Sequence, residues 1–342
     1  MPIARVSLGA RRISRPAVLL GALFLGPLFL AAGGDRVEAY RTVWGFVSAG
    51  QSQRTLIVLR TFLQDRERRC LVLDPASLRT AIRSAADIAI ESASREAVEK
   101  RIARAPYFDA LRDAAANAAA VQNAGLTRFL ASPPGIALTV DLCPSRKPLD
   151  RGLFTELIGE FGKDERPVPI AVAVTGVWME AHAPDLEFLK ELEKSGDISV
   201  TWINHSYHHR WDEALPLAAN FLLREGTDVA GEILQTEAAM IEHGLTPSVF
   251  FRFPGLVSDR KLLLTVESFG LIPVGSDAWL GKNQRPQEGS IVLVHANGNE
   301  PIGITRFLKL LREERPRILR REWLLLDLRE ATVAQEQKKG PR

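Results

Sequence analysis

The segment NHSYHH, residues 204–209, places His205 and His209 four residues apart directly after an apolar run. One helical turn sets residues at this spacing on the same face, where two imidazoles suit a zinc-like ion. We therefore interpret His205 and His209 as candidate metal ligands. His208 projects elsewhere in such a turn and is predicted to lie on the surface.

Three further residues that suit hydrolysis also end or follow apolar runs. Asp141 ends the run IALTVD, Arg252 lies in FRFPG, and His295 ends SIVLVH. A carboxylate can take a proton from water, and an imidazole that titrates near neutral pH can protonate a leaving amine. A metal ion that activates water and polarises a carbonyl would complete the requirements of amide hydrolysis.

Short apolar runs that alternate with helical segments must position these residues. The runs are 136–141, 168–174, 198–204, 248–253, 271–277, 290–295 and 323–328. Such alternation predicts an α/β fold with a parallel sheet covered on both sides, here a distorted (β/α) barrel. Barrel chemistry lies at the C-terminal ends of the strands, where the candidate residues fall. His182 and His243 are instead interpreted as structural, at a helix start and a helix end.

The first 34 residues are predicted to be an export signal, so we expect a periplasmic or extracellular protein. Four arginines and no acid accompany the apolar run AVLLGALFLGPLFLAAGG, which ends in small residues. The alternative is an uncleaved anchor that holds the protein at a membrane. Outside this leader, basic and acidic residues nearly balance, which gives no support for nucleic-acid binding.

Residues 35–132 are predicted to form a mostly helical extension packed on the main domain. Leu78 and Ile82 are four residues apart, as are Val98 and Ile102, which is helical spacing. The break SPPG marks the boundary to a main domain over residues 133–330. Residues 331–342 are predicted to be a polar tail.

The order of LTVDLCPS, NHSYHH, FRFPG, SDAW and IVLVH resembles the five motifs of the polysaccharide deacetylases with a NodB-homology domain, carbohydrate esterase family 4. The resemblance covers residues 136–328 and implies a barrel of the NodB type. It also implies the roles of the residues at the strand ends. These are Asp141 as general base, His205 and His209 as ligands of a divalent metal expected to be zinc, Arg252 as the residue that holds the base, and His295 as general acid.

The same resemblance implies three supporting residues and a substrate. Asp277 is similar to an acid that tunes His295, and Trp279 and Pro254 would contact the substrate. The expected function is removal of N-acetyl groups from an envelope or extracellular polysaccharide. Two alternatives are a catalytically impaired glycan-binding or envelope protein and a metal-independent amidase of the same superfamily.

The first motif diverges from the family at Leu142, which stands where the family carries a metal-binding acid. Two histidines are one protein ligand short of an open catalytic zinc site. Asp141 could become the third ligand, a remote acid such as Asp150 or Glu180 could substitute, or the site could bind little metal.

The chain has two cysteines, Cys70 and Cys143, and three interpretations of Cys143 are open. A Cys70–Cys143 disulfide would tie the N-terminal extension to the first motif of an exported protein. Cys143 could also be a buried apolar residue, or a thiolate ligand that compensates for Leu142. The sequence favours the disulfide over the buried thiol and ranks the thiolate ligand last, because Pro144 argues against a regular strand at this point.

Overall fold

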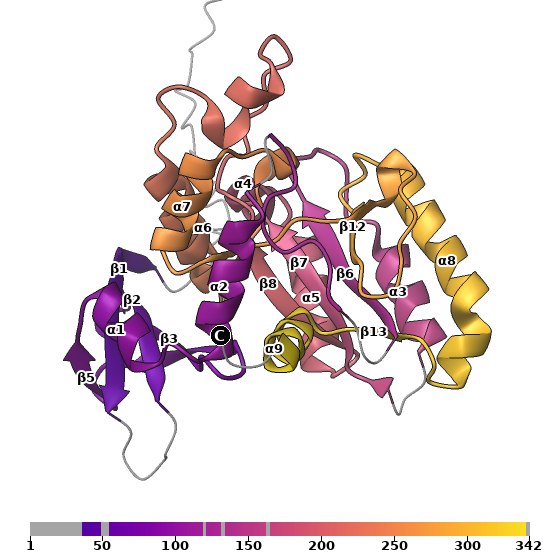
Figure 1. The fold of residues 1–342 in the computed structure, drawn as a ribbon. Helices are drawn as coiled ribbons and strands as arrows, with labels where there is room; N and C mark the ends of the chain where they lie inside the picture. Colours follow the sequence, from indigo (N-terminus) through magenta and orange to yellow (C-terminus); the bar gives the residue numbers. More distant parts are fainter. Residues whose placement is uncertain (1–35, 49–54, 119–120, 131–133, 162–164, 340–342) are drawn as a thin grey trace, which may run out of the picture. The chain divides into compact units, whose positions relative to one another are not determined.

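A parallel sheet forms the centre of the fold in the computed structural model, which describes residues 36–48, 55–118, 121–130, 134–161 and 165–339. Seven strands follow the order β10-β9-β8-β7-β6-β12-β11, and β13 pairs with β6 (Figure 1). Every apolar run predicted as a strand contains one, so the predicted distorted (β/α) barrel is confirmed. The strands are β6 (Gly135–Leu142), β7 (Val168–Val174), β8 (Ile198–Asn204), β9 (Phe250–Phe251), β10 (Ile272–Pro273), β11 (Ala278–Trp279), β12 (Ile291–His295) and β13 (Leu324–Leu325).

Helices connect these strands, and local capping explains where several of them begin. The side chains of Asp150, Thr175, Asp228 and Asp259 each accept a hydrogen bond from a backbone N–H of the first turn. His182 lies between two helices and His243 ends one, as predicted. The helices are α3 (Arg151–Glu160), α4 (Gly176–Ala181), α5 (Ala183–Lys194), α6 (Val229–Glu242), α7 (Arg260–Ser268), α8 (Pro301–Leu319) and α9 (Leu328–Lys339), which takes in most of the predicted polar tail.

The two faces of β6 pack against different parts of the chain. Ile136, Leu138, Val140 and Leu142 belong to an apolar cluster that includes residues of α3, α5 and α8. Ala137, on the opposite face of the pleated strand, packs in a second cluster with residues of α2 and with Leu328 of α9. We call the face of Ala137 the inner face of the sheet. Its C-terminal end carries Thr139 and Asp141, the polar residues of β6.

The N-terminal extension is not mostly helical, and this prediction was wrong. Within residues 37–48 and 55–92, five strands form an antiparallel sheet in the order β4-β3-β2-β1-β5, followed by α1 (Arg95–Arg101) and α2 (Pro106–Ala116). Asp65 and Arg66 both have positive φ, the turn geometry that joins two twisted strands tightly. The strands are β1 (Val37–Ser48), β2 (Leu56–Gln64), β3 (Glu67–Leu73), β4 (Thr80–Ser84) and β5 (Ala89–Ser92).

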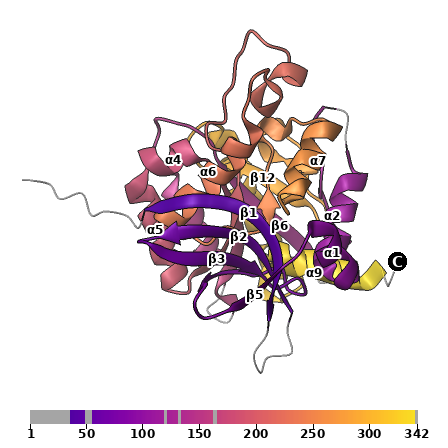
Figure 2. The same cartoon turned by 90° about the vertical axis from the view of Figure 1, so that its left-hand side faces the viewer.

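A buried ion pair joins this extension to the barrel. The Arg60 guanidinium on β2 donates to both carboxylate oxygens of Glu237 on α6, at 2.7 and 3.0 Å, and both side chains are 1% exposed. Tyr40 on β1 donates to the same carboxylate at 3.0 Å. Figure 2 shows β1, β2 and β3 as one curved sheet facing the viewer. The extension therefore packs on the main domain, as predicted.

The export leader and the domain boundary near residue 132 both stay predictions. The predicted leader lies outside the described residues. No helix in the part of the chain that the structure describes is long and apolar enough to cross a membrane. The predicted domain boundary near residue 132 stays a prediction, because residues 131–133 are also outside the described ranges.

Candidate active site

Strand register brings the candidate residues to one end of the sheet. His295 at the end of β12 is paired with Asp141 on β6, and Asn204 at the end of β8 is paired with Phe251 on β9. The residues that follow Asn204 and Phe251 therefore lie at the same C-terminal end as Asp141 and His295.

The loop after β8 presents the two histidines without a helical turn, contrary to the sequence interpretation. Ser206 and His209 have φ values of 66° and 50°, a backbone region that non-glycine residues rarely adopt. The Glu232 carboxylate on α6 accepts hydrogen bonds from the backbone N–H groups of Tyr207 and His208, at 2.8 and 2.9 Å. These bonds hold the loop so that the ring centroids of His205 and His209 are 4.8 Å apart.

His205 is held as a neutral imidazole with one nitrogen facing the other candidate residues. Nδ1 lies 2.8 Å from the carbonyl oxygen of Arg252, which accepts the N–H and fixes the tautomer. Nε2 is then left with a lone pair, 3.7 Å from Oδ2 of Asp141. Burial lowers the pKa of His205 to about 4, although the charge of Asp141 opposes this. Such an imidazole is suited to bind a metal ion.

Asp141 and Arg252 form a buried pair beside this histidine. Nη1 of Arg252 is 3.7 Å from Oδ1 of Asp141, and Nη2 donates to Oγ1 of Thr139 at 2.9 Å. Burial lowers the pKa of Arg252, while Asp141 opposes the change. Among the described residues, neither Oδ1 of Asp141 nor Nη1 of Arg252 has a hydrogen-bond partner. Buried polar atoms are rarely left in this state, so the site has capacity for a bound polar group.

His295 is oriented by an acid that the sequence did not indicate. Its Nδ1 lies 3.0 Å from Oε2 of Glu300, which also accepts from the indole N–H of Trp279 at 2.7 Å. Burial would lower the pKa of His295, but Cys143 and Glu300 outweigh it and raise the pKa to about 10. Asp277, expected to tune this histidine, instead lies 4.0 Å from Arg128, and burial raises its pKa.

Cys143 is a free thiol in the same group of residues, so the predicted disulfide is wrong. Cys70 is also free and is buried within the N-terminal sheet. Sγ of Cys143 lies 3.5 Å from Nε2 of His205. Burial raises the pKa of the Cys143 thiol, but the charges of His209 and His295 outweigh it and bring the pKa to about 7.

These residues include one set that could hold a metal ion. The ligand atoms of Cys143, His205 and His209 all lie within 4.8 Å of one another. In the part of the chain that the structure describes, Nε2 of His209 is buried without a hydrogen-bond partner. A sulfur and two imidazoles fit the ligand preference of zinc. The alternative third ligands lie elsewhere: Asp150 caps α3, and Glu180 contacts the hydroxyl of Tyr207.

Aromatic rings extend from His209 towards the surface, and the sequence analysis did not identify them. His209 packs against Phe221 at 5.1 Å between ring centroids, and Phe221 packs against Trp211 at 5.0 Å. Trp211 is 53% exposed. Gly255, the residue after Pro254, is beside this group, because a Cβ added to it would lie 2.5 Å from the Phe221 ring. On the other side, the Trp279 ring is 5.7 Å from that of His295.

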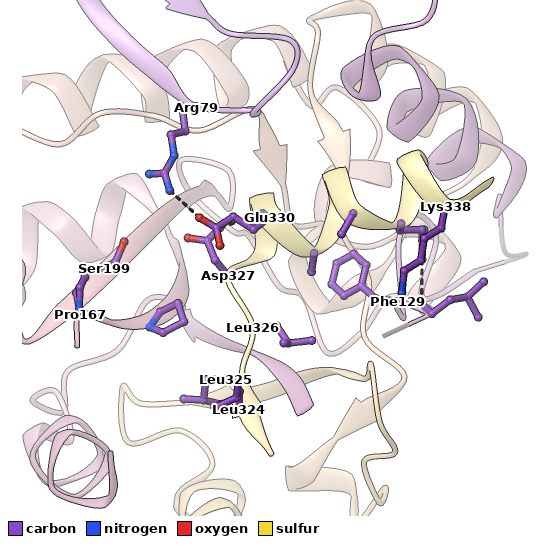
Figure 3. A pocket seen from close by; sticks show the side chains of 15 residues that line it. Arg79, Phe129, Pro167, Ser199, Leu324, Leu325, Leu326, Asp327, Glu330 and Lys338 are labelled. Atoms are coloured by element: carbon purple, nitrogen blue, oxygen red, sulfur yellow. Dashed lines mark hydrogen bonds and ion pairs between the residues drawn. The ribbon is translucent and has the colours of Figure 1, made fainter. Parts of the chain in front are cut away.

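A cavity of about 520 Å³ lies at the opposite end of the sheet and does not include these residues (Figure 3). It is lined by residues at the starts of β7 and β8, such as Pro167 and Ser199, and by residues of β13 and α9. Figure 3 shows Arg79 reaching Glu330 at its edge, where their side chains are 3.0 Å apart. The cavity therefore gives no contact to the candidate catalytic group.

No model of a known protein family matches the chain. Solved structures to which it is similar are family 4 carbohydrate esterases, the family that the motifs resemble. One, from Bacillus anthracis, has 18% identity and a TM-score of 0.45 over 66% of this chain and 90% of its own. A peptidoglycan deacetylase from Bacillus subtilis has 15% identity and a TM-score of 0.42 over 61% and 96%. A pseudoenzyme of the same family from Bacillus anthracis has 15% identity and a TM-score of 0.39 over 58% and 65%.

Proposed function

We propose that this protein is an exported hydrolase that removes N-acetyl groups from an envelope or extracellular glycan with the help of a divalent metal, expected to be zinc. The observation that carries the proposal is the position of His205. Its Nδ1 is committed to the Arg252 carbonyl, and its Nε2 faces Asp141 from the C-terminal end of the sheet. The five-motif resemblance of the sequence supports the glycan as substrate.

His205 and His209 would hold the metal, which supplies an activated water and a polarised carbonyl when bound. Asp141 would accept a proton from that water. Arg252 would hold Asp141 in position, because its Nη1 is 3.7 Å from Oδ1 of Asp141 in a buried site.

His295 would donate a proton to the leaving amine. Its raised pKa, about 10, means that the imidazole is protonated at neutral pH and can act as an acid. Glu300 occupies Nδ1 at 3.0 Å, so Nε2 would be the nitrogen that donates the proton. Trp279 and Pro254 are the residues we assign to substrate contact, next to His295 and Phe221 respectively.

Acetate release is the direct test. The purified protein is loaded with zinc and incubated with N-acetylglucosamine oligomers and with peptidoglycan. We expect acetate release that Asp141→Asn and His295→Gln each reduce at least about 100-fold, the range typical of general acid–base groups. A chelator should abolish release, and added zinc should restore it.

Two results would favour the alternative functions. Glycan binding without acetate release, in protein with full metal content, would identify a non-catalytic glycan-binding protein. Acetate release that survives the chelator but is lost in Asp141→Asn would identify a metal-independent amidase. Leu142 stands where the family carries a metal-binding acid, and this replacement is the reason to test for both alternatives.

A further inference from the structure

The residue directly after β6 lies beside the candidate metal ligands, whereas the last residue of the strand does not. Leu142 is fully buried on the face of β6 opposite the inner face, in the apolar cluster that holds Val140 and residues of α3 and α8. Successive side chains of a strand point to opposite faces, so Asp141 belongs to the inner face. Cys143 follows the last residue of β6, and both Asp141 and Cys143 contact His205.

Cys143 lies at the distance from His205 that a shared metal ion requires. With zinc–sulfur and zinc–nitrogen bonds of usual length, a tetrahedral site separates a sulfur from an imidazole nitrogen by about 3.5 Å. Sγ of Cys143 is 3.5 Å from Nε2 of His205. The ligand atoms of Cys143, His205 and His209 all lie within 4.8 Å of one another. A small movement of the loop that carries His209 would bring its nitrogen to the distance that a shared ion requires.

The surrounding contacts leave the facing atoms available. Asn297 donates to the carbonyl oxygen of Cys143 at 2.7 Å and fixes the backbone there, while the sulfur lies 3.5 Å from Nε2 of His205. Nε2 of His209 is buried and has no partner among the described residues. Cys143 itself is 6% exposed, so the thiol is protected from bulk solvent.

We propose that Cys143 is the third protein ligand of the metal, so that a Cys–His–His set replaces the acid–His–His set of the related family. This inference rests on the metal site of the proposed function and specifies its chemistry. A thiolate favours zinc and other thiophilic ions over ions that prefer oxygen, such as magnesium. Asp141 then stays free of the metal and keeps its place as proton acceptor.

Cobalt substitution tests the sulfur ligand without relying on activity. Cobalt(II) is added to the full-length, metal-free protein, and its absorption spectrum is recorded. We expect visible bands of four-coordinate cobalt together with a sulfur-to-cobalt charge-transfer band in the near ultraviolet. Cys143→Ser should lose the charge-transfer band and weaken zinc binding about 10- to 100-fold, while Cys143→Asp should lose the band but retain zinc through an oxygen ligand.

Cys70→Ser is the matched control, because Cys70 is the other buried free thiol and lies in the N-terminal sheet. This variant should keep the full spectrum. Far-ultraviolet circular dichroism shows whether each variant is folded. Four-coordinate visible bands without a charge-transfer band in the unaltered protein would overturn the inference.

The spectrum and the acetate assay can fail separately. A charge-transfer band in a protein that releases no acetate would support the sulfur ligand and reject the proposed hydrolase. Metal-dependent acetate release without that band would support the hydrolase and reject Cys143 as ligand. Loss of all cobalt bands in His205→Ala, with the fold intact, is expected if the metal lies at this site.

Discussion

Glu300 Oε2 lies 3.0 Å from Nδ1 of His295, five residues along the chain from the histidine that it orients. Hydrogen bonding from His295 and from Trp279 lowers the pKa of Glu300 despite its burial, so the acid is ionised. An ionised partner favours the imidazolium form of His295. Together with Cys143, Glu300 therefore raises the pKa of the proposed general acid.

Glu300→Gln is expected to lower kcat about 10-fold and to move the alkaline limb of the kcat/KM profile to lower pH. The direction follows because His295 must be protonated to act, and removal of the Glu300 charge lowers its pKa. The pH dependence of acetate release measures this. If Asp277→Asn moved the alkaline limb and Glu300→Gln did not, the role first expected of Asp277 would be correct.

The buried pair of Arg60 and Glu237 should dominate the stability of the contact between the N-terminal sheet and the barrel. Glu237→Gln leaves the guanidinium buried without a counter-charge, so we expect unfolding to need about 3–5 kcal/mol less. Denaturant unfolding at neutral pH measures the difference. Arg60→Met combined with Glu237→Leu should recover most of the loss, since apolar residues of similar size often replace buried pairs well.

Glu91→Gln provides the matched control for that measurement. Glu91 pairs with Arg101 at 3.0 Å, but the two side chains are 57% and 54% exposed. A solvent-exposed pair contributes no more than about 1 kcal/mol. Equal losses in Glu91→Gln and Glu237→Gln would show that the buried pair is not a principal contact.

The Cys143 thiol should ionise at lower pH than an ordinary thiol. In the metal-free Cys70→Ser variant, the ultraviolet absorbance of the thiolate should be half-maximal near pH 7, because the charges of His209 and His295 outweigh the effect of burial. His295→Gln should move this midpoint to higher pH. A thiolate absorbance that rises only above about pH 8.5, the range of an unperturbed thiol, would contradict the described surroundings of Cys143.

Trp211 is expected to bind a sugar ring beside the catalytic group. Its ring is exposed and connects through Phe221 to His209. Trp211→Ala should raise KM for glycan oligomers about 2- to 10-fold, a change that corresponds to the loss of one stacked ring, and should leave kcat almost unchanged. Leu264→Ala, an exposed apolar residue on α7, is the control and should alter neither constant. A larger change in kcat than in KM would argue against a binding role.

The barrel was predictable because its strands are continuous apolar runs that the sequence separates clearly by helices. The N-terminal sheet was not predictable in the same way, and one reason is the turn at Asp65 and Arg66, which joins β2 to β3. Both residues adopt positive φ without the glycine or asparagine that usually indicates such a turn. The spacing of Leu78 and Ile82 suggested a helix, whereas Ile82 lies in β4 and Val98 does lie in α1.

The positions of site residues that end or directly follow a strand were predictable. The positions of residues that depend on the path of a loop were less so. Asp141, His205 and His295 could be placed from the sequence alone. Glu300 lies in the segment before α8, and an acid within a few residues of a strand-end histidine was the signal that could have identified it. Cys143 was ranked last as a ligand because Pro144 suggested that the strand geometry would already be lost, yet its sulfur still reaches His205.

The contact between Arg60 and Glu237 also constrains when the protein can fold during its synthesis. The two residues are 177 positions apart, so the N-terminal sheet emerges from the ribosome long before its partner on α6. At ordinary rates of translation the delay is roughly 10 to 40 seconds. Throughout that time Arg60 has no counter-charge, and the apolar residues that later cover the inner face of the barrel have nothing to cover. The first sheet pairs only strands from its own part of the chain, so it can form early, but its docking on the barrel has to wait until Glu237 has been synthesised.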